Sequence, residues 1–204
     1  MTDRIKQIFG PKCTSINING DSDSFINIPS RKMTLCEAVN FSFKVPVRLN
    51  TTNLDCPGAR KSAGFDNNVE QLIKEISGHS NISENYIRTA LQTIPALKGI
   101  SHINLGLTES LEKDLSPDFY VMYIQPYRVT EIMHNLARLG IRPVIPTYSF
   151  LSVCGNVFAN CYLNQVVSIS FGCPESRKCG GIGKNEVVIG LPVKILAKLL
   201  HFYK

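Results

Sequence analysis

The sequence predicts a single compact domain of the α/β or α+β class, built on an internal pseudo-twofold duplication of a helix–strand–Cys-Pro turn unit. Three observations predict it. Two stretches of the chain repeat each other, strand-type and helix-type segments follow one another along the chain, and 204 residues of which 44% are hydrophobic can bury one sizeable core. We therefore expect one folding unit made of two related halves.

The repeated pattern is Ser/Thr, Leu/Val, Cys, x, x, Val, followed after a β-branched run by Cys-Pro-x-x-Arg-Lys. It begins at Thr34 in the first copy and at Ser152 in the second. The two cysteines of each copy lie 20 and 19 positions apart. One duplication would supply four thiols as two matched pairs, which are Cys36 with Cys56 and Cys154 with Cys173.

The repeats divide the domain into segments. We expect an irregular N-terminal segment, because its Asn-, Ser- and Asp-rich part shows little periodicity, and a mostly helical insert between the two repeats. The predicted segments are 1–31 (irregular), 32–65 (first Cys repeat), 66–115 (helical insert), 150–184 (second Cys repeat) and 185–204 (strand and C-terminal helix).

Local signals predict the elements of these segments. Thr34 and Glu37 form a capping-box pattern that starts a helix, and Ser152 is expected to cap the matching helix of the second copy. Further helices are predicted at about 69–76, from Ser83 to before Pro95, at 129–139, and from Pro192 to about 201. Strands are predicted at 45–49, 119–124, 166–171 and 186–190.

Composition and charge exclude some classes of function. The net charge of +6 is spread along the chain without a basic run interleaved with aromatics, so nucleic acid binding is not expected. Neither a secretory signal nor a transmembrane stretch is present, which predicts a cytoplasmic protein with no membrane partner. The last helix could lie on a membrane surface, but we expect it to dock against the core. In a reducing compartment, seven cysteines favour ligands, catalysts or buried residues over disulfides.

The matched cysteines occupy positions with chemical meaning. With Thr34 and Ser152 as N-caps, Cys36 and Cys154 fall at the second position of a helix, where free N–H groups and the helix dipole favour the thiolate. Cys56 and Cys173 each follow a strand and precede a proline, which predicts a sharp turn that exposes the side chain.

Four such thiols favour an iron–sulfur cluster, of the 4Fe–4S type, because full thiolate coordination needs four cysteines and the last ligand of many such motifs precedes a proline. Zinc is the second interpretation, although structural zinc sites usually use Cys-x(2–4)-Cys pairs and none of these pairs has that spacing. The third is a set of buried or redox-active thiols without metal. No Cys-x-x-Cys-x-x-Cys run is present, so spacing does not decide among them.

Arg60 and Arg177 each lie four residues after a Cys-Pro cysteine. Their guanidinium groups would offset the negative charge of a cluster or, with Glu175, form a small pocket for an anionic substrate or a partner. The alternative is that both are solvated turn residues. Of the other cysteines, Cys161 is expected in the core, Cys179 as a spare ligand or reactive thiol, and Cys13 has no pattern around it.

In combination, these motifs resemble the domain-of-unknown-function family 169 of archaea and bacteria, from about residue 33 to the C-terminus. The resemblance rests on Cys36-Glu37-Ala38-Val39, the two Cys-Pro motifs, Gly64-Phe65 and the Glu186–Pro192 segment. It implies a cytosolic prokaryotic protein and supports treating the four cysteines as one set, with no established reaction to carry over.

The function that we expect is iron–sulfur cluster binding in a cytoplasmic protein, for electron transfer or for cluster-assisted small-molecule chemistry. A redox partner or a small molecule is implied, self-association stays open, and so does enzymatic activity. The alternatives are a non-enzymatic zinc-binding scaffold or regulatory module, and a metal-free small-molecule binder with redox-active thiols.

Overall fold

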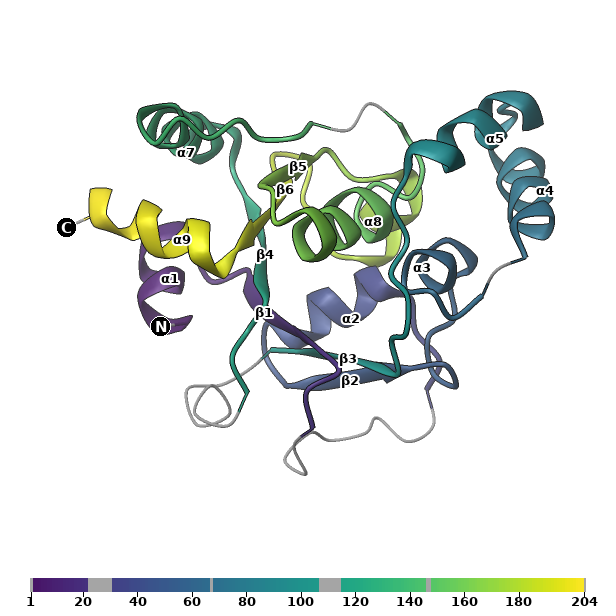
Figure 1. Cartoon of the computed structure of the whole chain (residues 1–204), viewed down its shortest axis with the longest axis horizontal. Coiled ribbons are helices and arrows are strands. Elements are labelled where there is room, and N and C mark those ends of the chain that lie inside the picture. The colour runs from purple at the N-terminus through teal and green to yellow at the C-terminus, as the bar shows by residue number, and fades with distance from the viewer. Residues whose placement is uncertain (1, 22–30, 67, 107–114, 146–147, 204) are drawn as a thin grey trace.

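The computed structural model describes residues 2–21, 31–66, 68–106, 115–145 and 148–203. It is an α+β domain in which helices cover a six-stranded antiparallel sheet. Figure 1 shows α1, α7 and α9 on one side of the sheet and α2, α3 and α8 on the other. The predicted fold class is confirmed.

The strands are β1 (Cys13–Ile18), β2 (Val47–Asn50), β3 (His102–Leu105), β4 (Phe119–Ile124), β5 (Ser168–Ser170) and β6 (Val187–Pro192). The α-helices are α1 (Thr2–Phe9), α2 (Leu35–Ser42), α3 (Pro57–Ser62), α4 (Val69–Ser80), α5 (Glu84–Thr93), α7 (Pro126–Arg138), α8 (Pro174–Cys179) and α9 (Val193–Leu199). A π-helix, η1 (Cys154–Asn164), precedes β5, and a 3-10 turn, η2 (Leu200–Phe202), follows α9.

The strand order, β2-β3-β1-β4-β6-β5, reads the same in both directions when β1, β2 and β3 are exchanged with β4, β5 and β6. Each half therefore has an edge strand, an inner strand and a central strand, and the central strands β1 and β4 pair antiparallel. Cysteines start the helices on either side of each edge strand: Cys36 and Cys56 around β2, Cys154 and Cys173 around β5. This symmetry of topology favours the internal duplication, which stays a prediction.

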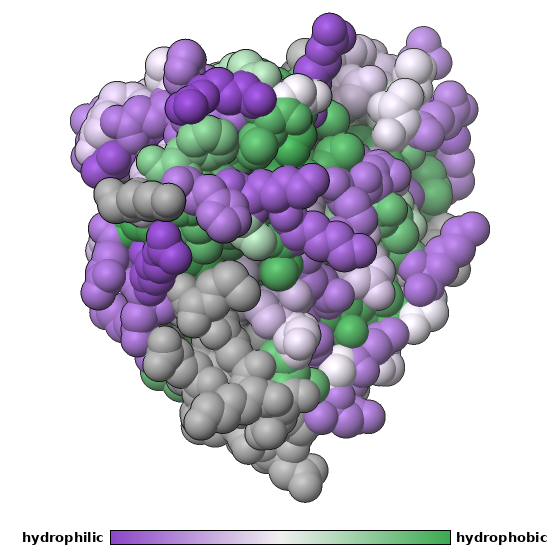
Figure 2. Space-filling model, turned by 60° about the vertical axis from the view of Figure 1, so that its left-hand side comes forward, coloured by the Kyte–Doolittle hydropathy of each residue, from purple (hydrophilic) through white to green (hydrophobic). Residues whose placement is uncertain are grey.

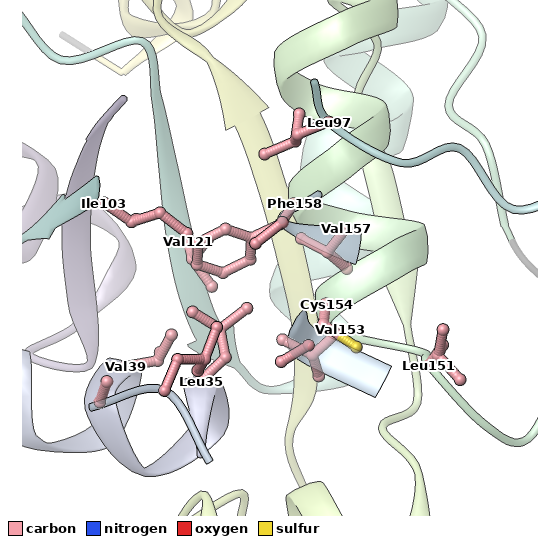
Figure 3. Close-up of a cluster of buried hydrophobic side chains, with 14 of the residues drawn as sticks. Leu35, Val39, Leu97, Ile103, Val121, Leu151, Val153, Cys154, Val157 and Phe158 are labelled. Atoms are coloured by element: carbon pink, nitrogen blue, oxygen red, sulfur yellow. The ribbon is translucent and has the colours of Figure 1, made fainter. Parts of the chain in front are cut away.

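Strand β4 is buried on both faces, so its side chains alternate between two hydrophobic cores. Phe119, Val121 and Tyr123 belong to the core under α2, α3 and η1, whereas Tyr120 and Met122 belong to the core under α1, α7 and α9. The first core is larger and contains the cysteine-bearing helices. In Figure 3, Val121 of β4 lies beside Phe158 of η1, with Leu35 of α2 nearby.

The second core fixes the place of the C-terminal helix. Leu196, Leu199 and Leu200 are buried in it, as expected for a helix that docks on the protein's own sheet. Figure 2 shows a face of the molecule on which hydrophilic side chains lie among hydrophobic ones. In the part of the chain that the structure describes, no helix is both long enough and apolar enough to cross a membrane.

Two expectations about the chain organisation are wrong. The segment expected to be irregular contains α1 and the central strand β1, and the expected helical insert contains β3. The sequence does not predict β1, because polar and apolar residues do not alternate in it although all six are buried. Its polar side chains find partners inside the protein: the Thr14 hydroxyl accepts a hydrogen bond from Ser42, and Asn17 accepts one from Asn104. Residues 22–30 and 107–114 of these two segments lie outside the described residues.

The other element predictions hold with shifted bounds, apart from the start of the second-copy helix, which is a π-helix that Ser152 does not cap. Thr34 caps α2 through the full capping box, in which its hydroxyl accepts from the Glu37 amide at 3.1 Å and the Glu37 carboxylate accepts from the Thr34 amide at 2.8 Å. α4 continues past Gly78 to Ser80, and α7 begins at Pro126, three residues before the predicted start.

Candidate functional site

The four matched cysteines all lie at the beginning of a helix. Cys36 is the second residue of α2, Cys154 is the first of η1, and Cys56 and Cys173 are the N-caps of α3 and α8. The last two therefore do more than form turns, because the prolines after them occupy the first helical position, where a missing N–H costs nothing. Free backbone N–H groups and helix dipoles at such positions favour a thiolate, but burial outweighs them here and raises the pKa of Cys36, Cys56 and Cys154.

The predicted cap of the second copy is wrong. Val153, not Ser152, precedes η1, and the Ser152 hydroxyl makes no hydrogen bond. The amides of Gly155 and Asn156 both bond to the Leu151 carbonyl, and Leu151 has a positive φ of 50°. The turn that begins η1 is therefore wider than an α-helical N-terminus, although Cys154 still lies in it.

Packing between the two halves brings the cysteine-bearing helices together in two pairs. α2 of the first half contacts α8 of the second, and α3 contacts η1. Each helix of one repeat thus lies against a helix of the other, although β2 and β5 are at opposite edges of the sheet. We call Cys36, Cys56, Cys154 and Cys173 the four-cysteine site.

The charges of these thiols act on one another. Burial raises the pKa of Cys36 well above its usual value, and the charges of Cys154, Cys173, Cys56 and the additional Cys179 raise it further. Burial also raises the pKa of Cys154, and the charges of Cys56 and Cys173 raise it further. Since charge–charge effects fall off with distance, the four sulfur atoms share one region of the protein.

Hydrogen-bond donors surround the sulfur atoms. The Cys173 sulfur accepts from the Ser176 amide at 3.4 Å, within a capping box that the Ser176 hydroxyl completes with the Cys173 amide at 2.8 Å. Burial raises the pKa of Cys56, and the nearby N–H groups of Ala59 and Gly58 oppose that rise. These donors compensate thiolate charge in a place that water reaches poorly.

Two buried hydroxyl groups also lie at the site. Ser62 at the end of α3 and Tyr123 of β4 are each 3% exposed, and neither oxygen makes a well-formed hydrogen bond. The Ser62 hydroxyl faces the Cys154 sulfur and lowers the pKa of Cys154 as a hydrogen-bond donor, against the larger effect of burial. Burial raises the pKa of Tyr123, and the charges of Cys36 and Cys173 raise it further. Unpartnered hydroxyls in a protein interior are costly, so these two need an acceptor.

The site has a deep side and an outer rim. Cys154 is 7% exposed and lies beside Val153 and Val157 in the first core (Figure 3), whereas Cys36, Cys56 and Cys173 are half-buried. All four are free thiols. The four thiols are therefore shielded from water at Cys154 and partly accessible to solvent at the other three cysteines.

The two repeated arginines have structural partners. The Arg60 guanidinium donates to the carbonyl oxygens of Thr51 at 2.7 Å and Leu54 at 3.2 Å, and that of Arg177 donates to those of Gly183 at 2.9 Å and Glu186 at 3.1 Å. Each arginine therefore ties a loop to the short helix that follows its cysteine.

The expectation that Arg60, Arg177 and Glu175 form one pocket stays a prediction. A surface pocket of about 160 Å³ lies between α3 and α4 and includes Arg60, Asp66 and Glu75 in its lining, but not Arg177 or Glu175. Glu175 is exposed and acts on the site through its charge, which raises the pKa of Cys56.

The remaining cysteines separate into two kinds. Cys161 is fully buried against Gly190 in the first core, and Cys13 is 1% exposed in the second core. Cys179 ends α8 and its charge reaches Cys36, so it belongs to the surroundings of the site. Cys161 is a core residue as expected, and Cys13 can serve as a reference remote from the site.

The residues fit a thiolate-bound group in their chemistry. Four thiols, several backbone N–H groups and two unpartnered hydroxyls converge, which is the donor set that sulfur-ligated irons need. Among the described residues, no three His, Cys, Asp or Glu side chains form a group that could hold one metal ion. A 4Fe–4S cluster does not require such a group, because each of its irons binds a different cysteine.

Sequence reasoning did not identify Tyr123 or Ser62. Tyr123 lies in a correctly predicted strand, but which face of that strand meets the cysteines depends on the packing of α2 and α8. Ser62 follows Cys56 by six residues, and nothing local marks it. No sequence signal distinguishes either hydroxyl from an ordinary core or surface group.

Comparison with known proteins agrees with the motifs. The family model of domain-of-unknown-function family 169, described as uncharacterised ArCR, matches residues 17–201. The chain belongs to this family. Neither the curated proteins nor the solved structures contain a significant match.

Proposed function

We propose that the protein binds one iron–sulfur cluster, of the 4Fe–4S type, at the four-cysteine site and serves as a redox protein. The observation that carries the proposal is the packing of α2 against α8 and of α3 against η1, which sets cysteine-bearing helices of the two repeats against each other. The charges of the four thiols, which raise one another's pKa, support it. When bound, such a cluster supplies one-electron chemistry.

The protein's own groups have defined tasks in this proposal. The start of α2 and the caps of α3 and α8 supply N–H groups and positive dipole ends that compensate thiolate charge. Cys154 anchors the group against the first core, where its apolar neighbours exclude water. Low water access and N–H donors are the features by which proteins set reduction potentials.

An electron would enter or leave through the rim of the site. Cys56 and Cys173 are half-buried, and the prolines that follow them are exposed. Phe171, which is 62% exposed, lies two residues before Cys173. A redox partner or a small electron donor could approach the sulfur atoms at this edge. Cytoplasmic location, as the family resemblance implies, is part of the same proposal.

Anaerobic reconstitution with iron and sulfide tests the function. The proposal predicts about four irons and four sulfides per chain, a brown protein, and an electron paramagnetic resonance signal on reduction. A colourless product without sulfide would overturn it. Stoichiometric zinc in the protein as purified, with loss of folding on chelation, would assign a zinc scaffold instead. Titration of reversible thiol oxidation with no bound metal would favour a redox-thiol protein.

A further inference from the structure

Two buried hydroxyl groups near the four-cysteine site make no well-formed hydrogen bond within the protein. Among the described residues, the buried side-chain atoms without a hydrogen-bond partner include the hydroxyls of Ser62 and Tyr123. A buried hydroxyl without an acceptor costs about 1–3 kcal/mol, so proteins seldom keep one unless something accepts its proton. What these two hydroxyls face is therefore informative.

The Tyr123 hydroxyl is held in place by its own strand and by α2. β4 pairs with β6 beside it, where Tyr123 lies opposite Val188, and the tyrosine ring packs edge-on against Phe43, with the ring centroids 5.1 Å apart. This packing directs the side chain into the first core, where its oxygen lies in the electrostatic reach of Cys36 and Cys173.

The Glu186 carboxylate does not serve as the missing acceptor. Glu186 also influences Tyr123, but one of its oxygens already accepts from the Lys12 ammonium and the Gly183 amide, each at 2.7 Å. No hydrogen bond joins Glu186 to Tyr123 in the described structure, and the tyrosine oxygen is left without a partner.

The Ser62 hydroxyl lies at the end of α3. Its oxygen is 3.3 Å from the place that a β-carbon on Gly155 would occupy, directly beside Cys154. A glycine at 155 thus lets the start of η1 approach the serine. The two hydroxyls come from different elements and meet different cysteines.

We infer that Tyr123 and Ser62 are positioning residues that donate hydrogen bonds to sulfur atoms of the bound iron–sulfur cluster and raise its reduction potential. The inference rests on the proposed function. Hydrogen bonds to ligand or bridging sulfur stabilise the more negative, reduced state, so donors at the sulfurs raise the potential. The cluster would then be an electron carrier whose reduction potential is raised by side-chain hydroxyls as well as by backbone amides.

Single-atom deletions test this inference on the reconstituted full-length protein. Tyr123→Phe and Ser62→Ala each remove one hydroxyl, and each is expected to shift the midpoint potential to a lower value, with additive shifts in the double variant because the two groups are at different cysteines. Resonance Raman spectra should show the iron–sulfur stretching bands moving in deuterated buffer for the wild type and less in the variants.

Tyr203→Phe is the matched control. Its hydroxyl is also buried without a well-formed hydrogen bond, but it faces Asn135 of α7, and its ring packs against Phe9 next to the second core, on the other face of the sheet. This control should leave the potential and the Raman bands unchanged. The iron content and the thermal unfolding temperature of each variant should match those of the wild type. Removing a hydroxyl that makes no well-formed hydrogen bond leaves no other buried polar group without its partner.

The outcomes separate this inference from the proposed function. A wild-type protein that binds a cluster, with both site variants at the wild-type potential, would overturn the inference and leave the function intact. An increase in potential would overturn it as well. A wild-type protein that forms no cluster would overturn both, and the iron and sulfide content records that case before any potential is measured.

Discussion

Gly180 lies directly against Cys36. A β-carbon at Gly180 would stand 2.8 Å from the Cys36 β-carbon and 2.5 Å from the Ser176 carbonyl oxygen. This close approach joins the end of α8 to the first turn of α2, and so joins the second repeat to the first. The four-cysteine site depends on that contact, because it fixes the distance between the two halves.

A methyl group at position 180 should therefore separate the helices. Gly180→Ala is expected to lower the free energy of unfolding by about 1–3 kcal/mol, the usual cost of overpacking, and to reduce iron binding. Chemical unfolding and iron analysis after reconstitution measure the two effects.

Gly78→Ala provides the comparison, because Gly78 is exposed in α4 and a β-carbon there meets nothing within 4 Å. That variant should gain about 0.5–1 kcal/mol from helix propensity and keep its iron. Equal stability of Gly180→Ala and the wild type would show that α8 and α2 are not packed as described.

Individual cysteine substitutions should divide the thiols into site and core. Alanine at Cys36, Cys56, Cys154 or Cys173 is expected to reduce cluster content strongly. Cys13→Ala serves as the matched control, since Cys13 is buried in the other core. It should cost about 1 kcal/mol of stability, as for a small core truncation, and leave iron and sulfide content unchanged.

Full cluster content in all four site variants would contradict the assignment of the ligands. Cys179→Ala refines the test, because this cysteine lies near Cys36 without a counterpart in the first repeat. If Cys179 only surrounds the site, its variant keeps the cluster.

The parts of this protein that the sequence could predict are those governed by local rules. The capping box of Thr34 fixed the start of α2, so Cys36 was correctly placed in its first turn. The matched spacing of the cysteine pairs indicated one set of four, and the charge effects among the thiols place them in one region.

The parts that could not be predicted depend on tertiary partners. β1 is a central strand whose buried polar residues find hydrogen bonds only in the folded sheet and on α2. The π-helical start of η1 follows from Leu151 adopting a positive φ, which no capping pattern indicates. The repeated offset of Arg60 and Arg177 predicted a role at the site, which stays a prediction, whereas their hydrogen bonds to loop carbonyls could not be predicted from the sequence.

The metal-free protein should lose stability in alkaline solution. Burial raises the pKa of Cys36 and Cys154 in the folded state, while the same thiols in the unfolded chain ionise near pH 8.5. Above that pH the unfolded state releases protons that the folded state keeps, so the free energy of unfolding falls as the pH rises from about 8 to 10.

Urea unfolding across that pH range measures the effect. A double variant with alanine at Cys36 and Cys154 should show a shallower decline, with a residual slope from Cys56 and Cys161, whose pKa values burial also raises. Constant or increasing stability of the wild type over this range would mean that these thiols are not buried in their protonated form.

Arg177→Gln tests whether the arginine acts on structure or on charge. Losing its bonds to the Gly183 and Glu186 carbonyls should cost about 1–2 kcal/mol while the cluster still binds. Lys178→Gln removes the same charge from an exposed neighbour and should change stability by less than about 0.5 kcal/mol. Loss of the cluster in Arg177→Gln at unchanged stability would assign the guanidinium to the cluster itself.

Native mass spectrometry of the anaerobically reconstituted chain tests the central claim most directly. The account predicts a single added mass equal to one 4Fe–4S unit in the wild type and in Cys13→Ala, and its loss when Cys36, Cys56, Cys154 and Cys173 are replaced together. A wild-type spectrum that shows only the bare chain, or the chain with one zinc ion, would contradict it.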